Sequence, residues 1–404
     1  MSAAKKSPGP LEGIRVLDLA TMLAGPYAAT LLGDLGADVI KVESHFGDDS
    51  RRLGPEVEGE RSPFIAINRN KRSLVLDLRT ERAQEVFAKL LETTDVVITN
   101  VREPACSKLG QSYEQVKKHR EDIIWAGVTS FGPDGPYAGR PGIDFLAQGY
   151  GGLLSLNGEP AERPVRVTVP LIDTMTSELV SVGVLAALFH RERTGEGQRI
   201  DVSLLDALTH AQCSGLGAFH MAGEVTPRTG NRSQYFAPSG VYPTKDGKSI
   251  VITCPSDKFF GHLANALEAD WTTDERFATI DGRLANEDLL DQVVAEGTMR
   301  FDRDELVVRL VEADVLTAPI NEIPEVAADP QIHHNEMIVE TQHTKLGALK
   351  VTGVPVKLRG SPGSVRQAPP VHGEHTRELL AELGYDAAAV DDLAADKAIG
   401  VWSG

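Results

Sequence analysis

The sequence is poor in cysteine and contains no long hydrophobic run. Its three cysteines, Cys106, Cys213 and Cys254, lie far apart and form no Cys-x-x-Cys pair, so neither a zinc site nor a disulfide framework is indicated. The longest apolar run, residues 179–189, is too short and too interrupted to span a bilayer. Residues 1–10 are polar and lack the apolar segment of a secretion signal. We therefore expect a cytoplasmic protein without a metal site and without a membrane partner.

Positive charge is in the minority. The chain has 41 Lys and Arg against 58 Asp and Glu, which gives a formal net charge of -17. This balance argues against nucleic acid as a partner, and an anionic ligand would need a local group of basic residues. The apolar content of 41% and the charged content of 25% are ordinary for a globular enzyme, and 404 residues are enough for two domains.

The N-terminal third alternates between strand and helix patterns. Apolar strands are predicted at 15–19 and 37–43, with a helix between them at 27–35. This β-α-β unit predicts a parallel sheet. The turn after the first strand has one glycine instead of Gly-x-Gly-x-x-Gly, so a nicotinamide oxidoreductase is disfavoured. The alternation continues to about residue 130 and predicts a doubly wound α/β fold.

A change of pattern divides the chain. A hairpin is predicted at 240–253, with Lys245–Lys248 as its turn, and helices follow it. We therefore expect four parts in this order: a Rossmann-like large domain over 10–205, a linker over 206–234, a small α+β domain over 235–325 and a linker with a C-terminal segment over 326–404.

Several basic residues lie in or near the loops that follow predicted strands, where open parallel sheets bind their ligands. They are Arg51, Arg52, Lys71, Arg72, Arg79, Arg102 and Lys108. Solvated surface charge is one reading of this group, because Lys and Arg are mostly exposed. A cradle for a polyphosphate is the other reading.

Asp173 stands at the start of a long apolar segment. The residues after it are apolar on nearly every face of a helix, so we expect a buried helix. Asp is a favoured N-cap residue because its oxygens accept the unpaired amide hydrogens of the first turn. The local pattern leaves two roles open for Asp173, a helix cap or a reactive carboxylate.

A series of short motifs runs along most of the chain. They are Leu11–Leu19, Ala24–Pro26, Leu35–Glu43, Asn70–Ser73, Asp95–Asn100, Gly135–Tyr137, Asp173, Arg193–Gln198, Lys245–Gly247 and Gly373–Thr376. In order and spacing they resemble the class III CoA-transferases, a family that includes formyl-CoA transferase and carnitine CoA-transferase and has α-methylacyl-CoA racemase as a relative. The resemblance covers about residues 10 to 385.

The resemblance implies an interlocked homodimer of the class III CoA-transferase type, with the C-terminal segment returning to the large domain. It implies that Asp173 is the nucleophile and that Asp144 supports the active site. Coenzyme A is then bound as substrate and product, and no metal is required. Together with the basic loops, the resemblance predicts these CoA-binding residues: Leu23, Ala24, Lys71, Arg72, Leu76, Arg79, Asn100, Val101, Arg102 and Lys108.

The implied chemistry is covalent catalysis by a carboxylate. A carboxylate beside a thioester attacks its carbonyl to form a mixed anhydride, and the CoA thiolate then forms an aspartyl thioester. The nucleophile must be ionised, which suits an Asp with an ordinary pKa of about 3.9. A helix N-terminus would help to hold that charge.

Two alternatives differ from a CoA-transferase. Racemases of the family carry a Gly-His-Asp segment whose His moves a proton, whereas this chain has Gly142-Ile143-Asp144, and isoleucine carries no proton. A 2-methylacyl-CoA racemase or epimerase is therefore disfavoured. A non-catalytic CoA-binding subunit of a hetero-oligomer is the other alternative, and the presence of Asp173 argues against it.

The acid substrates are not defined by these motifs. Arg51, Arg52, Arg232 or His45 could bind a second carboxylate, which would suit succinyl-CoA or another dicarboxylyl-CoA as the donor. Some family members close a multi-glycine loop over the site, but residues 230–240 contain no glycine run. The sequence therefore leaves open whether a lid loop closes over the site.

Overall fold

The computed structural model describes residues 9–404 and divides the chain into two compact units. The large unit contains the chain up to Gly151, together with Val167–Leu216 and Pro330–Gly404. The small unit contains Gly152–Arg166 and Gly217–Asp329. These limits do not coincide with the expected boundaries, and residues 217–234 and 326–329, expected in linkers, lie in the small unit. Residues 206–216, expected in a linker, lie in the large unit, and residues 152–166, expected in the large domain, lie in the small unit.

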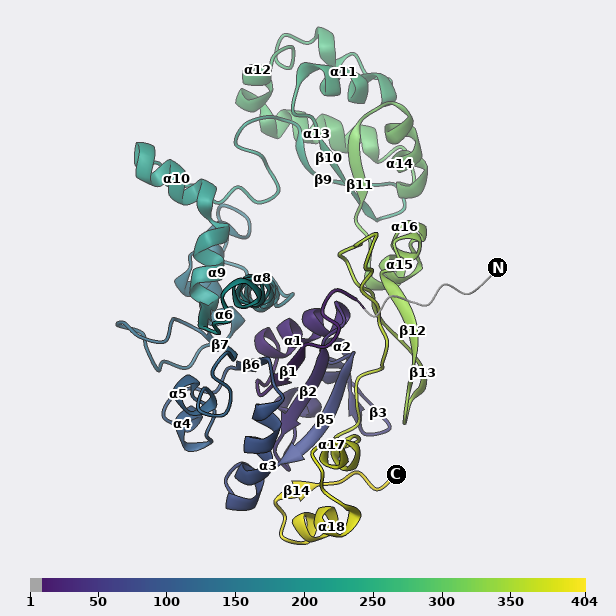
Figure 1. Ribbon diagram of the computed structural model, residues 1–404. Helices are drawn as coiled ribbons and strands as arrows, with labels where there is room; N and C mark the ends of the chain where they lie inside the picture. Colours follow the sequence, from purple (N-terminus) through teal and green to yellow (C-terminus); the bar gives the residue numbers. More distant parts are fainter. Residues whose placement is uncertain (1–8) are drawn as a thin grey trace. The chain divides into compact units, whose positions relative to one another are not determined.

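A seven-stranded sheet forms the centre of the large unit (Figure 1). Its strands are β1 (Arg15–Asp18), β2 (Asp38–Glu43), β5 (Lys71–Leu76), β6 (Val96–Thr99), β7 (Ile124–Thr129), β8 (Arg199–Ser203) and β14 (Ile399–Gly400). Their order is β14-β5-β2-β1-β6-β7-β8, and every pairing is parallel except that of β14 with β5. The predicted α/β fold with a parallel sheet is confirmed. The order reverses at β1, which pairs with both β2 and β6, and such a reversal opens a crevice at the carboxyl ends of the strands.

Helices cover both faces of this sheet. The helix α3 (Glu81–Glu92) packs onto one face, where Val86, Phe87 and Leu90 join the buried side chains of the strands. Thr80 caps α3 by accepting the amide hydrogen of Ala83, as a threonine before an apolar helix predicts. The helix α1 (Ala24–Asp34) packs against α8 (Leu171–Thr194) on the other face.

The C-terminal segment belongs to the large unit. The helices α17 (Thr376–Glu382) and α18 (Ala387–Ala395) place Leu379, Leu380 and Leu393 in the same core as α3. The short strand β14 then extends the sheet beyond β5. The last 75 residues therefore complete the large unit.

The helix α8 is less buried than its sequence predicts. Ile172, Val180 and Val184 are buried, but Val182 and Phe189 are 62% and 65% exposed. The expectation of a helix buried on nearly every face is wrong for this chain by itself, because α1, α9 and the sheet cover only part of its circumference. By length and composition alone, α8 is long and apolar enough to cross a membrane. Its buried side, however, packs against α1 as in the core helix of a globular protein.

Shorter elements complete the large unit. They are η1 (Asp49–Arg52), β3 (Glu56–Val57), β4 (Glu60–Arg61), α2 (Ser62–Ile67), α4 (Ala105–Lys108), α5 (Tyr113–Val116), α6 (Asp144–Tyr150), α9 (Leu204–Ala211), α16 (Pro330–His334), β12 (Ile338–His343) and β13 (Gly347–Thr352). The helix α10 (Cys213–Ala222) leads from the large unit into the small one.

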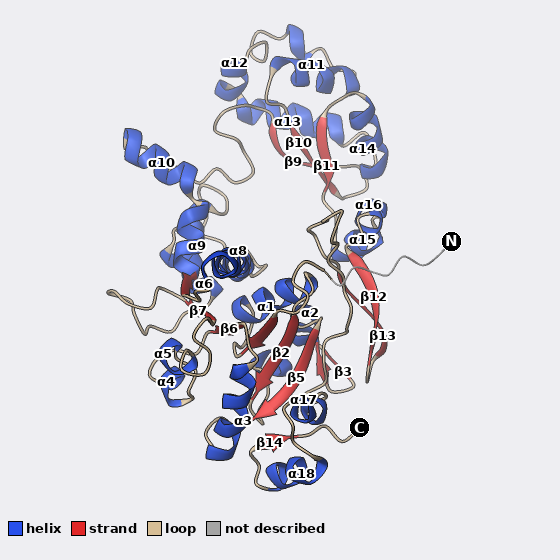
Figure 2. Ribbon diagram, in the orientation of Figure 1, coloured by secondary structure: helices blue, strands red, loops and turns tan. Residues whose placement is uncertain are grey.

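The small unit is built on a three-stranded antiparallel sheet (Figure 2). The predicted hairpin is confirmed, since β9 (Ser239–Pro243) pairs with β10 (Ser249–Thr253) across the Lys245–Lys248 turn. The strand β11 (Leu316–Pro319) adds to β10. The remaining elements are α7 (Leu153–Leu156), α11 (Asp257–Ala266), η2 (Trp271–Thr273), α12 (Ile280–Ala285), α13 (Glu287–Thr298), α14 (Arg303–Glu312) and α15 (Ile323–Ala328).

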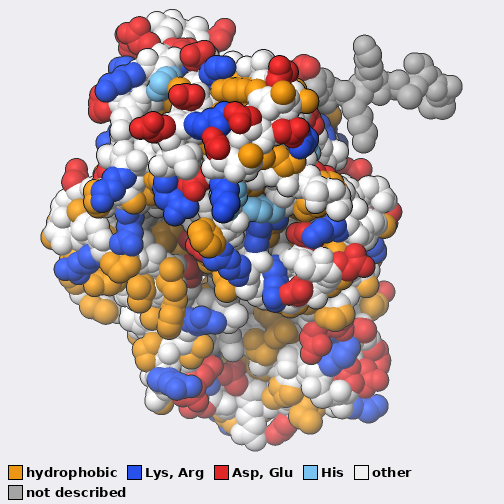
Figure 3. All heavy atoms as spheres, turned by 90° about the horizontal axis from the view of Figure 1, so that it is seen from below, with side chains coloured by type: hydrophobic (Ala, Val, Ile, Leu, Met, Phe, Trp, Pro, Cys, Tyr) orange, Lys and Arg blue, Asp and Glu red, His pale blue; other side chains and the backbone are white. Residues whose placement is uncertain are grey.

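Charge on the surface is mixed. On the face shown in Figure 3, basic and acidic side chains are interspersed, with hydrophobic side chains between them. That face is therefore neither uniformly basic nor uniformly acidic.

Candidate active site

Asp173 is the third residue of α8 and does not cap it. The N-cap position belongs to Pro170, which has no side chain that can accept a hydrogen bond. A carboxylate oxygen of Asp144, the first residue of α6, accepts instead from the backbone amides of Ile172 (2.8 Å) and Asp173 (3.2 Å). The cap expected from Asp173 is therefore supplied by Asp144, which satisfies two of the amides left unpaired at the helix start.

The second oxygen of Asp144 is also held. The side-chain amide of Gln148 donates to it at 2.6 Å and donates to the carbonyl of Val167 at 3.0 Å. The Gln148 side-chain oxygen in turn accepts the amide hydrogen of Val167 at 3.0 Å, and Gln148 is fully buried. These bonds tie α6 to the segment that leads into α8, so they fix the position of Asp144 beside Asp173.

The pairing of two carboxylates changes the acidity of Asp173. Burial, as the larger cause, and the negative charge of Asp144 together raise the pKa of Asp173 to about 7. Asp144, and not Asp173, accepts from the amides of Ile172 and Asp173 that were expected to help hold the charge of Asp173. Near neutral pH, Asp173 therefore exists in both the protonated and the ionised form.

Ser177 connects Asp173 to the start of α1. Its hydroxyl lies 2.8 Å from the carbonyl oxygen of Ala24 and 2.9 Å from that of Asp173, so one hydroxyl separates the two backbones. Ala24 is the first residue of α1, directly after Leu23 and close to the carboxyl end of β1. The structure thus brings Asp173, Asp144, Leu23 and Ala24 to one end of the large sheet.

A cavity of about 310 Å³ lies at the carboxyl ends of β1, β2, β5 and β6. Three of the predicted CoA-binding residues, Leu76, Arg79 and Val101, line it. Asn100 lies at its edge, where its side chain accepts from the amide of Thr21 (3.0 Å) and donates to the carbonyl of Thr21 (2.7 Å). The cavity occupies the position at which a doubly wound sheet binds its ligand.

Arg79, Arg102 and Lys108 keep exposed positive groups. The Arg79 side chain is largely exposed and pairs only with Asp77, two residues away, at 2.7 Å. Lys108 is exposed on α4. Arg102 lines a second cavity of about 400 Å³, where it donates to the carbonyl of Gly139. Phosphate groups could replace these weak or neutral partners.

The structure corrects the prediction for Lys71 and Arg72. The ammonium of Lys71 is fully buried and contacts Asp18 (2.8 Å), the carbonyl of Pro26 (2.6 Å) and Asn68 (2.7 Å). Arg72 is bonded to acidic residues of β2 and α17, which are Asp38, Glu378 and Glu382. Both residues lie on β5 with their charged ends already paired inside the large unit, so neither presents its charge to a ligand.

The candidates for a second carboxylate are also mostly paired. Arg51 makes two bonds to Glu43, at 2.8 and 2.9 Å, and lies over the ring of Phe64. His45 contacts the carbonyl of Lys397 at 2.7 Å. Arg52 is more exposed than Arg51, with its side chain 52% exposed and its acidic partner, Asp49, at 3.9 Å.

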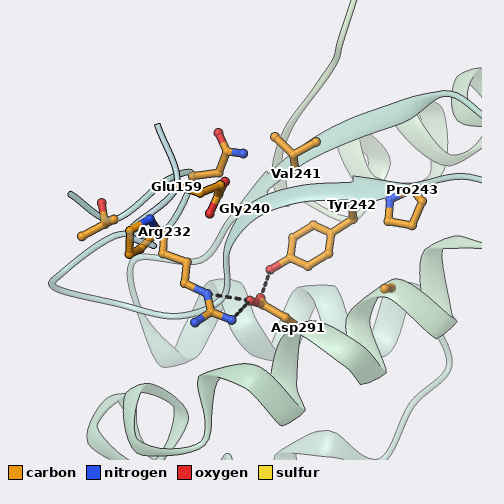
Figure 4. A pocket seen from close by; sticks show the side chains of 11 residues that line it. Glu159, Arg232, Gly240, Val241, Tyr242, Pro243 and Asp291 are labelled. Carbon is orange, nitrogen blue, oxygen red and sulfur yellow. Dashed lines mark hydrogen bonds and ion pairs between the residues drawn. The ribbon is translucent and has the colours of Figure 1, made fainter. Parts of the chain in front are cut away.

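Arg232 lies in the small unit and lines a pocket of about 460 Å³ (Figure 4). Its guanidinium pairs with Asp288 (2.7 Å) and Asp291 (2.8 Å), and the hydroxyl of Tyr242 donates to Asp291 at 2.7 Å. Figure 4 shows the ends of Arg232 and Tyr242 converging on Asp291. Because acidic residues already neutralise Arg232, the structure does not favour it as a carboxylate receptor.

Gln148 and Ser177 were not singled out from the sequence. Each stands four residues after one of the two active-site carboxylates, on the same face of its helix. That spacing is the signal that could have identified them. Over residues 9–404, no group of three or more His, Cys, Asp or Glu side chains has the arrangement of a metal site.

Comparisons with known proteins show the family of this chain. The family model described as CoA-transferase family III matches residues 11–376. The succinyl-CoA–L-malate CoA-transferase beta subunit of Chloroflexus aurantiacus is 36% identical over 397 residues, which cover 96% of this chain and 98% of that protein. The succinate–glutarate CoA-transferase of Agrobacterium fabrum is 35% identical, with coverage of 93% and 96%. The crystal structure of a CAIB/BAIF family protein from Brucella suis matches with a TM-score of 0.87, 36% identity and coverage of 93% and 99%.

The fold is that of a mixed α/β protein with a large, mostly parallel sheet. The chain belongs to CoA-transferase family III. It is a CoA-transferase, and CoA thioesters are its substrates.

Proposed function

We propose that this enzyme transfers CoA from succinyl-CoA, or from another dicarboxylyl-CoA, to a carboxylic acid, with Asp173 as the nucleophile. The observation that carries the proposal is the placement of Asp173 at the start of α8. Its backbone amide donates to Asp144, and the Ser177 hydroxyl links its carbonyl to that of Ala24, directly after the β1–α1 turn. The names of the two relatives support the choice of acids, since both name succinyl or succinate together with a dicarboxylic partner.

The reaction conserves an activated acyl bond through four steps. A carboxylate oxygen of Asp173 attacks the thioester carbonyl, which forms a mixed anhydride and releases CoA thiolate. The thiolate attacks the Asp173 carbonyl of the anhydride, which forms an aspartyl-CoA thioester and releases the donor acid. The acceptor carboxylate attacks that thioester and displaces the thiolate again. The thiolate finally attacks the acceptor carbonyl of the second anhydride, which yields the new acyl-CoA and regenerates the Asp173 carboxylate.

Asp144 acts in this scheme by positioning. Its carboxylate holds the amides of Ile172 and Asp173, so the first turn of α8 keeps one orientation while the side chain of Asp173 changes its bonding. Its charge helps to raise the pKa of Asp173 towards 7, which makes the ionised Asp173 a more basic carboxylate than an exposed Asp.

CoA is proposed to bind along the carboxyl ends of the strands. Leu76 and Val101 line the 310 Å³ cavity, Leu23 and Ala24 stand where the β1–α1 turn enters α1, and Asn100 holds that turn through Thr21. Arg79, Arg102 and Lys108 supply positive charge for the phosphates of CoA, and Arg79 would exchange its exposed bonds to Asp77 for bonds to phosphate.

The protein is proposed to act in the cytoplasm as an interlocked dimer. The exposed apolar face of α8, which includes Val182, Leu185 and Phe189, supports a second chain on this helix, because large apolar side chains gathered on one face favour contact with another protein. The C. aurantiacus relative is named as a beta subunit, so the second chain is either another copy or a paralogue. Sedimentation of the protein purified alone distinguishes these cases, since a dimer formed without a second gene product supports the homodimer.

A donor–acceptor screen with purified protein tests the reaction. Succinyl-CoA and monocarboxyl-CoA donors are incubated with short mono- and dicarboxylic acids, and new thioesters are measured by mass spectrometry. Transfer that favours dicarboxylates supports the proposal, whereas transfer without that preference contradicts the choice of acids. Hydroxylamine trapping should modify Asp173, and modification of another carboxylate would contradict its role. Racemisation of a 2-methylacyl-CoA without transfer would favour the racemase alternative, and CoA binding without either reaction would favour the non-catalytic subunit.

A further inference from the structure

Met22 has a strained backbone on the turn between β1 and α1. Its φ is +70°, in the left-handed region, which costs about 1–2 kcal/mol for a residue with a side chain. Glycine or asparagine would adopt this conformation more easily. Its side chain is 40% exposed, so burial in the core does not explain why methionine stands there. Strained residues of this kind gather at functional sites.

The turn is held through the backbone of three consecutive residues. The amide of Ala20 donates to Asp18 (3.1 Å), and its carbonyl accepts from Lys41 (2.9 Å). Asn100 binds both the amide and the carbonyl of Thr21. The amide of Met22 donates to Asp48 at 3.1 Å. Side chains from separate segments therefore fix the turn residue by residue.

Buried ion pairs hold these side chains in turn. Lys41 contacts Asp18 (3.3 Å) and Asp48 (2.8 Å), and Lys71 contacts Asp18 (2.8 Å). We name Asp18, Lys41, Asp48 and Lys71 the charge brace, and all four side chains are at most 1% exposed. A paired and fully buried network is rigid. The backbone of the turn is therefore held in place, and with it the direction of the Cα–Cβ bond of Met22.

The braced turn lies next to Asp173. Met22 is two residues before Ala24, whose carbonyl shares the Ser177 hydroxyl with the carbonyl of Asp173. The first turn of α1 is also tight against the braced turn, because a Cβ on Gly25 would lie 2.4 Å from the Cβ of Ala20. An exposed, apolar side chain thus stands on the braced turn, two residues before Ala24, whose backbone is one hydroxyl away from that of the proposed nucleophile.

We propose that Met22 contacts the acyl group of the substrate and determines which acyl groups the site accepts. This inference rests on the proposed function, because it assumes that the acyl group is attacked by Asp173. A methionine side chain has three rotatable bonds and a polarizable sulfur, so it packs well against a short methylene chain of variable length. The ligand class is the aliphatic segment of a CoA thioester, between its carbonyl and its far carboxylate.

Binding to an unreactive enzyme tests this contact. In an Asp173→Asn background, dissociation constants are measured by calorimetry for CoA and for dicarboxylyl-CoA thioesters with two to four methylene groups. Met22→Gly removes the side chain and relieves the strain, and it should weaken the thioesters about fivefold or more while CoA changes less than twofold. Met22→Leu should restore most of the difference. Glu58→Gly is the matched control, because Glu58 is also exposed with a positive φ of +49° but lies on the turn between β3 and β4.

The proposal fails if Met22→Gly and Glu58→Gly give the same ratio of thioester to CoA affinity. It also fails if Met22→Gly weakens CoA and its thioesters equally, which would mark Met22 as a residue that only shapes the turn. Should Met22→Gly not fold, Met22→Asn tests the same point, because asparagine tolerates this backbone conformation. The proposed function is judged separately, by transfer in the wild-type enzyme, whereas the absence of all binding to CoA thioesters would overturn both.

Discussion

Two charged clusters lie in the large unit and differ in their balance of charge. The charge brace contains two lysines and two aspartates, fully buried and bonded to one another. The second cluster contains two carboxylates, Asp144 and Asp173, which are tied together through backbone amides and have no cation in the bonds described for them. Balanced charge stabilises both partners, whereas like charges raise a pKa and leave one group ready to react. The first cluster is therefore expected to maintain structure and the second to perform chemistry.

The largest expected effect is on activity at the unbalanced cluster. Asp173→Asn removes the nucleophile and should lower CoA transfer by at least about a thousandfold. Because the folded state raises the pKa of Asp173 to about 7, the protonated form is favoured by folding, and stability falls as pH rises through the native pKa. Above pH 7, the free energy of unfolding of the same variant should therefore exceed that of the wild type by about 1–3 kcal/mol, so the variant should unfold at a higher urea concentration. Activity assays and urea titrations at pH 5 and pH 8 check both effects. A variant that is inactive and equally destabilised at both values would contradict this reasoning.

A substitution in the charge brace should change the stability of the protein. Lys71→Met leaves Asp18 with only Lys41 as a cationic partner, and we expect a loss of about 2–4 kcal/mol in the free energy of unfolding. Burial lowers the pKa of Lys71 to about 8, below that of a lysine in the unfolded chain, so the wild type gains stability as pH rises above that value and the loss should become larger, by about 1 kcal/mol at pH 9. Urea denaturation at pH 7 and pH 9 measures both points. Arg79→Met, at an exposed charge, is the control and should change stability by less than about 0.5 kcal/mol.

Asp144→Asn should bring the pKa of Asp173 closer to that of an ordinary aspartate. Asparagine keeps an oxygen for the amides of Ile172 and Asp173 but removes the negative charge. The pKa of Asp173 should then fall below 7 while burial keeps it above its usual value, since burial is the larger cause. The acidic limb of the profile of kcat/KM against pH should move to lower pH, with kcat reduced several-fold at the optimum. An unchanged limb would show that the charge of Asp144 does not control Asp173.

The smallest effect is expected at the exposed charge of Arg79. Arg79→Met should raise the KM for acyl-CoA about three- to tenfold and leave kcat within a factor of two, because a phosphate contact far from the reacting bond contributes to binding in every state. The salt dependence of KM should also become weaker. Arg82→Met is a matched control on the neighbouring helix α3, where Arg82 pairs with Asp392 and Asp396. Equal effects of the two variants would contradict a phosphate contact at Arg79.

Local patterns were sufficient for most of the fold. The β-α-β alternation predicted the parallel sheet, and the Lys245–Lys248 turn predicted the hairpin of the small unit. These features depend on periodicity and turn residues within about 30 positions, so the sequence displays them directly. The order of strands around β1 and the addition of β14 from the far end of the chain depend on long-range pairing, and periodicity does not report it.

The candidate site was predictable in type but not in its arrangement. Leu76, Arg79 and Val101 were predicted to bind CoA, and all three line one cavity. Lys71 and Arg72 were predicted to bind CoA as well. They lie on β5, which is buried, and their charged groups pair with Asp18 and Asp38 inside the protein. A run of basic residues does not reveal which members meet buried carboxylates, because those carboxylates come from β1, β2 and α17.

By itself, the sequence determined the fold class, the family and the presence of one aspartate at the start of an apolar helix. These properties reside in residue types and short spacings. Only the tertiary structure decided the electrostatic environment of that aspartate. Asp144 comes from a helix 29 residues earlier, takes the amides that Asp173 was expected to hold and raises its pKa together with burial. Electrostatic environment depends on distance in space, so it arises only once α6, α8 and the braced turn have packed together.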